Sequence, residues 1–526
     1  MSHSPHCQPH CCPAIPETPL TEAQLEVSRR SFLAMGGVFM GGLSFAALQN
    51  TLQAAEDAEP VAMPIPRKPL IVKPVFSWNH HQYHHQTSWR GWGEVQDPEA
   101  AAVELNRIKA DIDGIKRRAD YPVEFMEVTS ISDVNQLQDN PDMAACDVIL
   151  FYGAGHSIHG IQNFGKDVIF FNRWRSGPFY LQHQIIHPRF MRSHTDALAQ
   201  PGLDWSDVVT DEPLELDWRF RALCGLKNSL NQKIVCIGGP SAWAQPYGSV
   251  PEIAAKTWGY EYHSVGFDEI ARLVREAMAD DKTLARARRR ADAYLRIPGT
   301  RLETTDDFFV RSFVLDDLFR LLMQEVGTNL ITVNSCMVAI MPAAETTACL
   351  ALSTLQDDRY HAWCESDFVV IPSGVLLGNI TGKPSFFTNP SYPHRGLMTT
   401  AHCSAPRKMD GKTYYPTRIM THQESEYGAA PYIEYPRGTE ITCLIPAFSG
   451  QRWSGFKGSI SNVPFRNICR TQFDLQFDFP NKLLIENMRG FHWMICFGDY
   501  RREVGYALRR VGIQWDNLDE VPTKTM

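Results

Sequence analysis

The sequence predicts an α/β fold, with Rossmann-like parallel-sheet domains followed by a C-terminal antiparallel β domain. Strand-like runs alternate with amphipathic helical patterns from about residue 70 to 385, and such alternation is typical of parallel sheets. From about Tyr414 the helical periodicity ends and short strand-like runs follow one another, which indicates a separate antiparallel unit. A length of 526 residues is enough for about two or three folded units.

Each element of the α/β part has its own signal. A helix is expected to begin after Asp97, because Asp97 can cap the first N–H groups and Pro98 suits the first helical position. Strands are expected where short apolar runs occur, and helices where apolar residues recur with helical spacing. The expected strands lie at 123–128, 148–151, 168–171 and 233–237, and the clearest expected helices lie at 267–278 and 313–323.

The last third is expected to contain the strands T-R-I-M-T-H, T-E-I-T-C-L-I and C-R-T-Q-F-D-L-Q-F, followed by one helix over 501–512. Together the patterns divide the chain into successive segments with different characters. These are a leader with an export signal (1–58), a Pro-rich linker (59–75), an N-terminal α/β domain (76–240), a second α/β domain (241–410) and a C-terminal β domain (411–526).

The composition is that of an ordinary globular protein and argues against nucleic-acid binding. Apolar residues make up 44% of the chain, and the net charge is −8, whereas nucleic-acid affinity depends on basic surfaces. The arginine-rich run at 286–290 falls in a helical pattern and is expected to be a solvated helix face. No C-x-x-C pair follows the leader, so neither a zinc ribbon nor a disulfide scaffold is indicated.

The N-terminus resembles a twin-arginine (Tat) export signal. S-R-R-S-F-L at 28–33, with Arg29 and Arg30, precedes a Gly-rich apolar run and then small residues suited to cleavage near Glu56. The expected location is therefore periplasmic or exported, with the Tat translocase as a partner during export. An uncleaved signal that anchors the chain in the membrane is the alternative. Tat substrates fold before they cross the membrane, which favours a metal inserted in the cytoplasm.

Two carboxylates occur together in H-A-W-C-E-S-D-F-V-V, at 361–370. If the strand continues through them, Glu365 and Asp367 lie on one face, and two carboxylates side by side need a cation between them. Helical patterns flank this run, so the pair is expected near the end of a sheet strand, where α/β sheets place their ligand sites. The alternative is that Asp367 caps the following helix and Glu365 pairs with a surface arginine.

Several motifs in the C-terminal half resemble the L-fucose isomerase and related sugar-isomerase family. They are C-E-S-D, then T-G-K-P-S-F-F, then A-H-C-S-A-P, and finally G-F-H-W-M-I-C-F-G-D-Y-R-R-E. The resemblance covers roughly residues 330–512, and over 70–300 it extends only to the α/β architecture. It implies an aldose–ketose isomerase that acts on a monosaccharide and assembles as a homo-oligomer, with residues of a neighbouring subunit at the substrate pocket.

The resemblance also implies a divalent metal, typically Mn²⁺ with Mg²⁺ as the alternative, held by an Asp, a Glu and a C-terminal His. Asp367 and His492 match the Asp and the His. Neutral residues occupy the expected position of the Glu, so Glu345 is the nearest candidate and Glu365 is another. The metal is expected to polarise O1 and O2 of the open-chain sugar, while one of these carboxylates moves the proton through an enediol.

Four further residues are candidates for substrate binding. His402 in A-H-C-S is expected either to bind sugar hydroxyls or to be a buried histidine bonded to the backbone. Trp89 and Arg90 lie in a His- and Trp-rich segment at 78–93, which is expected to contact the sugar or a neighbouring subunit, because aromatic rings stack on sugar faces. Arg175 lies in a second basic and aromatic cluster at 171–190 that is expected to line the pocket.

Two other functions remain open. One is a non-catalytic sugar-binding relative, since the Glu that serves the family as a proton carrier is replaced. The other is an NAD(P)-dependent dehydrogenase, suggested by F-Y-G-A-G-H-S-I-H-G after an expected strand. Its glycines at 153, 155 and 160 do not have the G-x-G-x-x-G spacing, and the next strand ends in Asn172 in place of an acidic residue.

Overall fold

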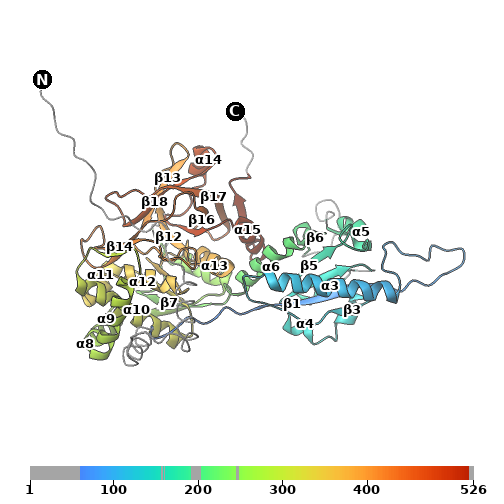
Figure 1. The fold of residues 1–526 in the computed structure, drawn as a ribbon, viewed down its shortest axis with the longest axis horizontal. Coiled ribbons are helices and arrows are strands. Elements are labelled where there is room, and N and C mark those ends of the chain that lie inside the picture. Colours follow the sequence, from blue (N-terminus) through green and yellow to red (C-terminus); the bar gives the residue numbers. More distant parts are fainter. Residues whose placement is uncertain (1–59, 156–157, 159, 191–202, 244–247, 521–526) are drawn as a thin grey trace, which may run out of the picture.

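The computed structural model describes residues 60–155, 158, 160–190, 203–243 and 248–520. The expected leader and export signal at 1–58 lie outside the described residues. Within the described part the predicted fold class is confirmed: two parallel-strand sheets precede a closed, mainly antiparallel β-barrel. Figure 1 shows the N-terminal sheet with α3 at one end of the molecule, and the barrel strands above the second sheet at the other.

The N-terminal sheet is parallel throughout, in the order β2-β1-β4-β5-β6, with β3 also beside β1. Helix α3 begins as expected, because the Asp97 side chain accepts a hydrogen bond from the N–H of Ala100. The strands are β1 (Leu70–Ser77), β2 (Val123–Phe125), β3 (Thr129–Ile131), β4 (Val148–Gly153), β5 (Asp167–Asn172) and β6 (Val208–Thr210). The helices are α3 (Pro98–Arg118), α4 (Asp142–Ala145), α5 (Leu181–Phe190) and α6 (Leu214–Lys227).

The linker expected at 59–75 is shorter than predicted, because strand β1 already begins at Leu70. Pro74 suggested a linker, since proline lacks the N–H that a central strand needs. On one side β1 pairs with β2 up to Val72 and with β3 from Val75, so Pro74 faces the break between these two strands. A proline at that position costs no hydrogen bond of the sheet.

The second sheet is also parallel, in the order β11-β10-β7-β8. The strand expected at 233–237 and the helices expected at 267–278 and 313–323 are all present. Its strands are β7 (Lys233–Ile237), β8 (Glu261–Val265), β10 (Leu330–Val333) and β11 (His361–Cys364). Its helices are α7 (Ser249–Trp258), α8 (Phe267–Ala279), α9 (Asp281–Leu295), α10 (Asp306–Val326), α11 (Cys336–Ala344), α12 (Cys349–Asp357) and α13 (Ile371–Thr381).

In the C-terminal sheet the strands lie in the order β16-β19-β12-β13-β18-β17. The first strand, β16, pairs with its neighbour β19 and also with β17, so these six strands close into a barrel. The barrel strands are β12 (Phe386–Pro390), β13 (Leu397–His402), β16 (Glu440–Pro446), β17 (Arg452–Asn462), β18 (Thr471–Gln476) and β19 (Trp493–Phe497). Strand β20 (Gln514–Asn517) joins β17 in parallel, and a small sheet contains β9 (Thr300–Leu302), β14 (Thr417–Met420) and β15 (Ala430–Ile433). The remaining helices are α14 (Asn481–Glu486) and α15 (Arg501–Arg510).

The barrel begins earlier than the boundary expected at residue 411. Strands β12 and β13 belong to it, because β12 pairs in antiparallel orientation with β19 and β13 does so with β18. Strand β12 comes directly after helix α13, and this order suggested another α/β unit. The sequence does not show that β12 pairs with β19, about a hundred residues further on.

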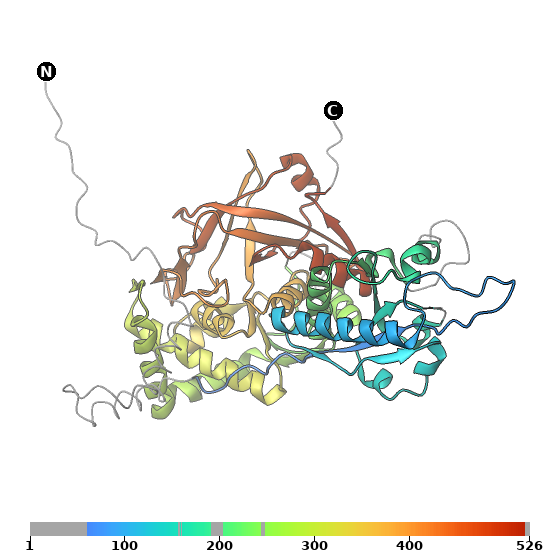
Figure 2. The same ribbon diagram turned by 45° about the vertical axis from the view of Figure 1, so that its right-hand side comes forward.

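The second sheet and the barrel share one hydrophobic core. Buried Trp363 of β11, the apolar side chains of the fully buried helix α13, and Phe387 and Met494 of the barrel belong to the same cluster of packed side chains. Helix α15 packs against α6 and α13, and Tyr506 reaches the core of the N-terminal sheet. In Figure 2, α15 lies where the barrel approaches the N-terminal domain. The site described below therefore rests on a rigid base.

The arginine run at 286–290 is not the solvated face that its sequence suggested. Arg290 is buried and pairs with Asp316, with 2.6 Å between Nη2 and Oδ2, and also with Asp317. Arg286 Nε lies 2.6 Å from Asp317 Oδ2. Both acids lie on α10, which packs along α9. The sequence showed the helical spacing of these residues, but it did not show that α10 covers this face of α9.

Across the described ranges, no individual helix has the length and apolar character needed to cross a membrane. Helices α11 and α12 meet that test only as a pair, with a 94° bend between them.

The packing of α6 on α13 leaves no room for a side chain at Gly225. A Cβ there would lie 2.4 Å from Cγ1 and 2.8 Å from the backbone of Ile380. We expect Gly225→Ala to lower the free energy of unfolding by about 1–3 kcal/mol through overpacking. Gly114→Ala on α3 is the matched control: its Cβ meets only flexible arginine side chains, so it should stabilise by up to about 1 kcal/mol. Chemical denaturation measures both, and equal effects of the two substitutions would contradict the packing argument.

Candidate functional site

The carboxylates of the C-E-S-D motif lie in a tight turn, not along a strand. Strand β11 ends at Cys364, and the next two residues have left-handed backbone conformations, with φ of 69° at Glu365 and 48° at Ser366. The expectation that Glu365 and Asp367 share one strand face is therefore wrong. Such backbone angles are costly for residues with a Cβ, and they occur where a site holds its side chains in fixed positions.

The turn instead places the two carboxylates on opposite sides of one imidazole ring. His492 Nδ1 lies 2.7 Å from Asp367 Oδ2, and His492 Nε2 lies 3.2 Å from Glu365 Oε2. His492 is completely buried and directly precedes β19 of the barrel. The expected convergence of Asp367 and His492 is thus confirmed, and the group between the two carboxylates is a histidine.

A second histidine faces the same carboxylate. His402, at the end of β13, is buried, and its Nε2 lies 3.6 Å from Glu365 Oε1. Its other nitrogen, Nδ1, lies 3.1 Å from the hydroxyl oxygen of Ser404. His402 is buried, as one of its two expected roles requires, but its ring contacts the hydroxyl of Ser404 and the carboxylate of Glu365 in place of backbone. Its expected contact with sugar hydroxyls stays a prediction.

Glu365, His402 and His492 can hold a divalent cation. One ligand atom from each residue lies within 4.8 Å of the others. Two ligands bound at about 2.1 Å to one ion are about 3.0–3.4 Å apart, close to the 3.2 and 3.6 Å separations seen here. Two histidines with one carboxylate and open positions suit Zn²⁺, Fe²⁺ or Mn²⁺.

The buried Nε2 of His492 supports this fit. Although Glu365 Oε2 is only 3.2 Å away, the geometry does not make a hydrogen bond, and Nε2 has no other hydrogen-bond partner among the described residues. A buried ring nitrogen without a hydrogen bond is uncommon and calls for an explanation. A cation shared by Glu365 and His492 requires that the lone pairs of Oε2 and Nε2 point at the ion and not at each other.

Asp367 positions the site and does not face the space between these three ligand atoms. Its Oδ2 receives the hydrogen bond of His492 Nδ1, and its Oδ1 accepts from the N–H of Val369. A carboxylate behind a histidine ligand fixes the ring orientation and raises its basicity. Asp367 therefore supports His492. It does not cap α13, because the N-cap of that helix is Val370 and, among the described residues, no side chain bonds to its first N–H groups. Asp367 is also not one of the three residues whose ligand atoms cluster here.

The charges of the cluster shift its protonation equilibria. Burial opposes the ionisation of Glu365, but the close contacts and the charge of His402 and His492 together hold the pKa of Glu365 well below its usual range. Burial also opposes the charged form of His492, yet Asp367 and Glu365 raise the pKa of His492 above its usual value. Without a metal, the cluster is thus stabilised as an anionic Glu365 beside a cationic His492.

Two partly exposed aromatic side chains lie beside this site. Trp243 and Phe491, each 47% exposed, pack against each other and against the ring of His492. Phe387 covers the inner side, with its ring centre 4.4 Å from that of His492. The sequence interpretation missed Trp243, Phe491 and Ser404. Phe491 and Ser404 are in the quoted motifs, whereas Trp243 follows β7 and carries no signal of its own.

Glu345 is not part of the cluster. It follows α11, its side chain is 60% exposed, and it pairs with Arg311 at 2.9 Å. The sequence placed it by spacing from the C-E-S-D motif, and the ion pair with α10 holds it elsewhere. Glu365 takes the place that was expected for Glu345.

The other substrate candidates lie on the N-terminal domain. Trp89 and Arg90 stack on each other in the long segment between β1 and α3, and Figures 1 and 2 show this blue segment projecting from the far end of that domain. The segment is not helical. Arg175 stacks on Trp174 after β5. Within one chain, these residues do not join the cluster.

No protein-family model matches the chain, and a search among curated proteins finds no significant match. The resemblance to sugar isomerases therefore depends on the quoted motifs, two of which contribute His402 and His492 to the cluster.

The raised pKa of His492 makes a prediction for the metal-free protein. A histidine whose folded pKa exceeds its unfolded value adds stability that is complete below the unfolded pKa, about 6.5, and is lost as the pH rises through the folded pKa. We expect the difference in melting temperature between the wild type and His492→Gln to shrink as the pH rises from 6 to 9, measured in chelator. Parallel pH curves for the two proteins would contradict the paired, charged state of His492.

Proposed function

We propose that the protein is a metal-dependent enzyme that acts on a monosaccharide, with aldose–ketose isomerisation as its reaction. The observation that carries the proposal is the convergence of Glu365, His402 and His492 on one position from two different folding units. The motifs shared with the sugar isomerases supply the reaction class. Mn²⁺ is the proposed metal on the basis of that resemblance, and Zn²⁺ and Fe²⁺ are the competitors that two histidine ligands introduce.

Each residue of the site has a distinct task in this proposal. Glu365, His402 and His492 hold the cation, while Asp367 and Ser404 fix the tautomers and orientations of the two histidines. The cation supplies Lewis acidity toward two adjacent oxygens of the open-chain sugar, which acidifies the C–H bond between them. Trp243 and Phe491 offer partly exposed ring faces beside the site, on which the apolar face of a sugar can stack.

Isomerisation needs a residue that carries a proton from one carbon of the sugar to the next. Whether Glu365 can do so separates isomerisation from a second candidate function. A general base works best with a pKa near the working pH, whereas His402 and His492 hold the pKa of Glu365 far below it. This observation favours, as the second candidate, a sugar-binding protein that retained the site and lost turnover. Both candidates need the same metal and the same sugar, so they differ only in whether the C–H bond is broken.

Export and assembly complete the proposal. The Tat-like motif around Arg29 and Arg30 supports export of the folded, metal-loaded chain. The segment that carries Trp89 and Arg90 extends away from the cluster of its own chain, so in a homo-oligomer these residues, together with Arg175, are available to the site of a neighbouring subunit.

Metal content provides the first test. We expect the wild type, purified after folding in cells, to contain about one divalent metal per chain, and Glu365→Gln and His402→Gln to lose at least about 90% of it, since each removes one of three ligands. Glu345→Gln is the matched control and should retain the metal, because Glu345 pairs with Arg311. Elemental analysis measures the result. Loss in Glu345→Gln with retention in Glu365→Gln would overturn the ligand set.

Turnover is tested by hydrogen exchange at carbon. In D₂O, we expect the metal-loaded protein to introduce deuterium at C1 or C2 of its sugar and to interconvert aldose and ketose, as followed by NMR. Glu365→Gln should lower kcat/KM by about 10²–10⁴, and Glu99→Gln, an exposed position in the first turn of α3, should leave it unchanged. Saturable sugar binding without any deuterium uptake would establish the second candidate, and the absence of both would reject the two together.

A further inference from the structure

A cavity of about 730 Å³ lies at the opposite end of strand β11 from the metal-ligand cluster. Tyr360 and His361, at the start of β11, line it, as does Asn329, which directly precedes β10. Glu365 follows the other end of β11, about 13 Å further along the strand. Ligand sites of parallel sheets normally lie at the carboxyl ends of the strands, so this cavity is separate from the cluster and at the unusual edge.

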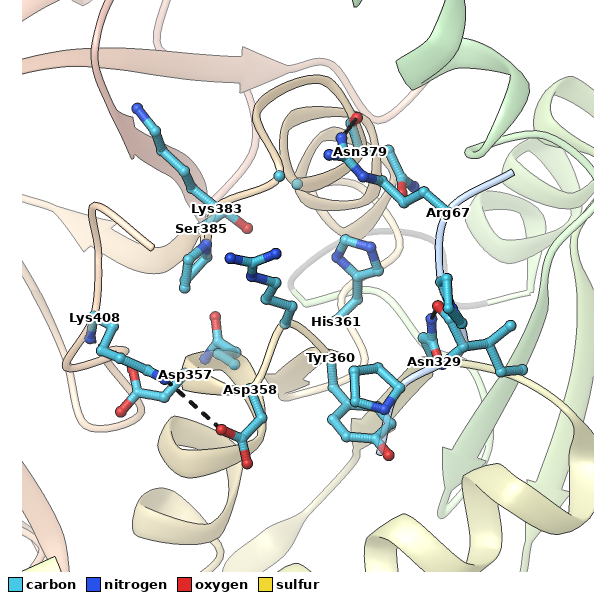
Figure 3. A pocket seen from close by; sticks show the side chains of 18 of the residues that line it. Arg67, Asn329, Asp357, Asp358, Tyr360, His361, Asn379, Lys383, Ser385 and Lys408 are labelled. Atoms are coloured by element: carbon cyan, nitrogen blue, oxygen red, sulfur yellow. Dashed lines mark hydrogen bonds and ion pairs between the residues drawn. The ribbon is translucent and has the colours of Figure 1, made fainter. Parts of the chain in front are cut away.

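One wall of the cavity is the extended segment that precedes β1. Asn329 fixes this segment through two hydrogen bonds with the backbone of Ile65, of 2.8 Å to its N–H and 2.7 Å to its carbonyl oxygen. Arg67 then enters the cavity wall and donates to the carbonyl oxygen of Asn379, near the end of α13, at 2.7 Å. Figure 3 shows Arg67, Asn329 and Asn379 on one side of the cavity. The wall is therefore built by specific polar contacts.

Basic residues outnumber acidic ones in the lining of this cavity. Arg67, Arg359 and Lys412 line it, and within the part of the chain that the structure describes none of their side-chain nitrogens has a carboxylate oxygen within 4 Å. Burial lowers the pKa of Arg67 and the charge of Arg359 lowers it further, whereas Cys224 and Asp120 raise it. Arg67 and Arg359 thus lie within electrostatic reach of each other, and Asp120 is in direct contact with Arg221, at 2.9 Å. Two neighbouring cations without a carboxylate in direct contact form a site for an anion.

The other cationic residues are already engaged. Lys408 lies 3.8 Å from Asp358, and the amine of Lys383 donates to the hydroxyl of Tyr500 at 2.9 Å. Figure 3 shows the Lys383 side chain directed away from Asp358 and His361. Arg67, Arg359 and Lys412 are thus the cations left to meet a ligand.

Three buried polar atoms of the cavity residues have no hydrogen-bond partner. They are Gln356 Oε1, Asp357 Oδ2 and Ser385 Oγ, on side chains that are 1%, 6% and 2% exposed. Buried polar atoms are almost always satisfied, so three such atoms on residues that line one cavity are unusual. Burial also raises the pKa of Asp357 to about 7, so near neutral pH its carboxyl can either accept or donate a hydrogen bond.

We propose that this cavity binds a small anionic polyol, that is, a sugar-like molecule that bears a carboxylate or a phosphate. The anionic group lies against Arg67 and Arg359, with Lys412 beside them, and its hydroxyl groups meet the polar residues of the lining, among them Gln356, Asp357 and Ser385. A volume of this size holds a monosaccharide derivative with room for bridging water. The proposal is independent of the metal cluster, since it shares none of its residues.

Isothermal titration of the purified full-length protein tests the proposal with four probes: gluconate, glucose 6-phosphate, uncharged glucose and inorganic phosphate. We expect one of the two anionic sugars to bind at least tenfold more tightly than glucose and than inorganic phosphate. Preference between gluconate and glucose 6-phosphate identifies the anionic group. Equal binding of inorganic phosphate would overturn the polyol, equal binding of glucose would overturn the anion, and no binding of any probe would overturn the site.

Variants connect the binding to this cavity. Arg359 and Lys412 are exposed at the cavity, so Arg359→Gln and Lys412→Gln are expected to fold and to weaken binding of the anionic sugar at least tenfold each. Arg117→Gln on the exposed end of α3 is the matched loss of one positive charge and should leave the affinity unchanged. Equal affinity in all three variants would place the binding elsewhere and overturn the proposal.

Discussion

The buried contact of His492 with Asp367 and Glu365 is the interaction on which the rest of the site depends. The two acids follow a strand of the second sheet, whereas His492 enters from the barrel 125 residues later. A buried charge is tolerated only when it is paired, and removal of one partner from a buried pair typically costs about 3–5 kcal/mol. The contact therefore both joins two folding units and fixes the ring that faces the proposed cation.

The strained turn at Glu365 and Ser366 persists because neighbouring segments hold it from both sides. The N–H of Glu365 donates to the carbonyl oxygen of Val333, and that of Ser366 donates to the hydroxyl of Thr332, both on β10. The segment after β7 pairs with the turn on its other side, through Ser241. Unfavourable backbone angles survive when the surroundings over-determine them, so the position of the Glu365 carboxylate is set by the sheet and not by its own torsional preference.

Local signals in the sequence predicted much of the fold, and non-local contacts account for what they missed. The Asp97 cap and the apolar runs at β4, β5 and β7 are properties of adjacent residues, so α3 and these strands could be predicted. The left-handed turn at Glu365 could not, because a strand pattern does not reveal where the backbone reverses. Spacing suggested Glu345 as a ligand, but its ion pair with Arg311 depends on how α10 packs. His402 and His492 were found by motif, whereas Trp243 has no local signal.

Strand β11 connects two polar regions of opposite character. At its carboxyl end, Glu365 and Asp367 surround a histidine, and at its amino end Arg67 and Arg359 line a cavity. Both ends lie on one buried core, because Trp363 of β11 packs with α13 and the barrel. The close packing of this core fixes the strand, and with it the spacing between the two polar regions.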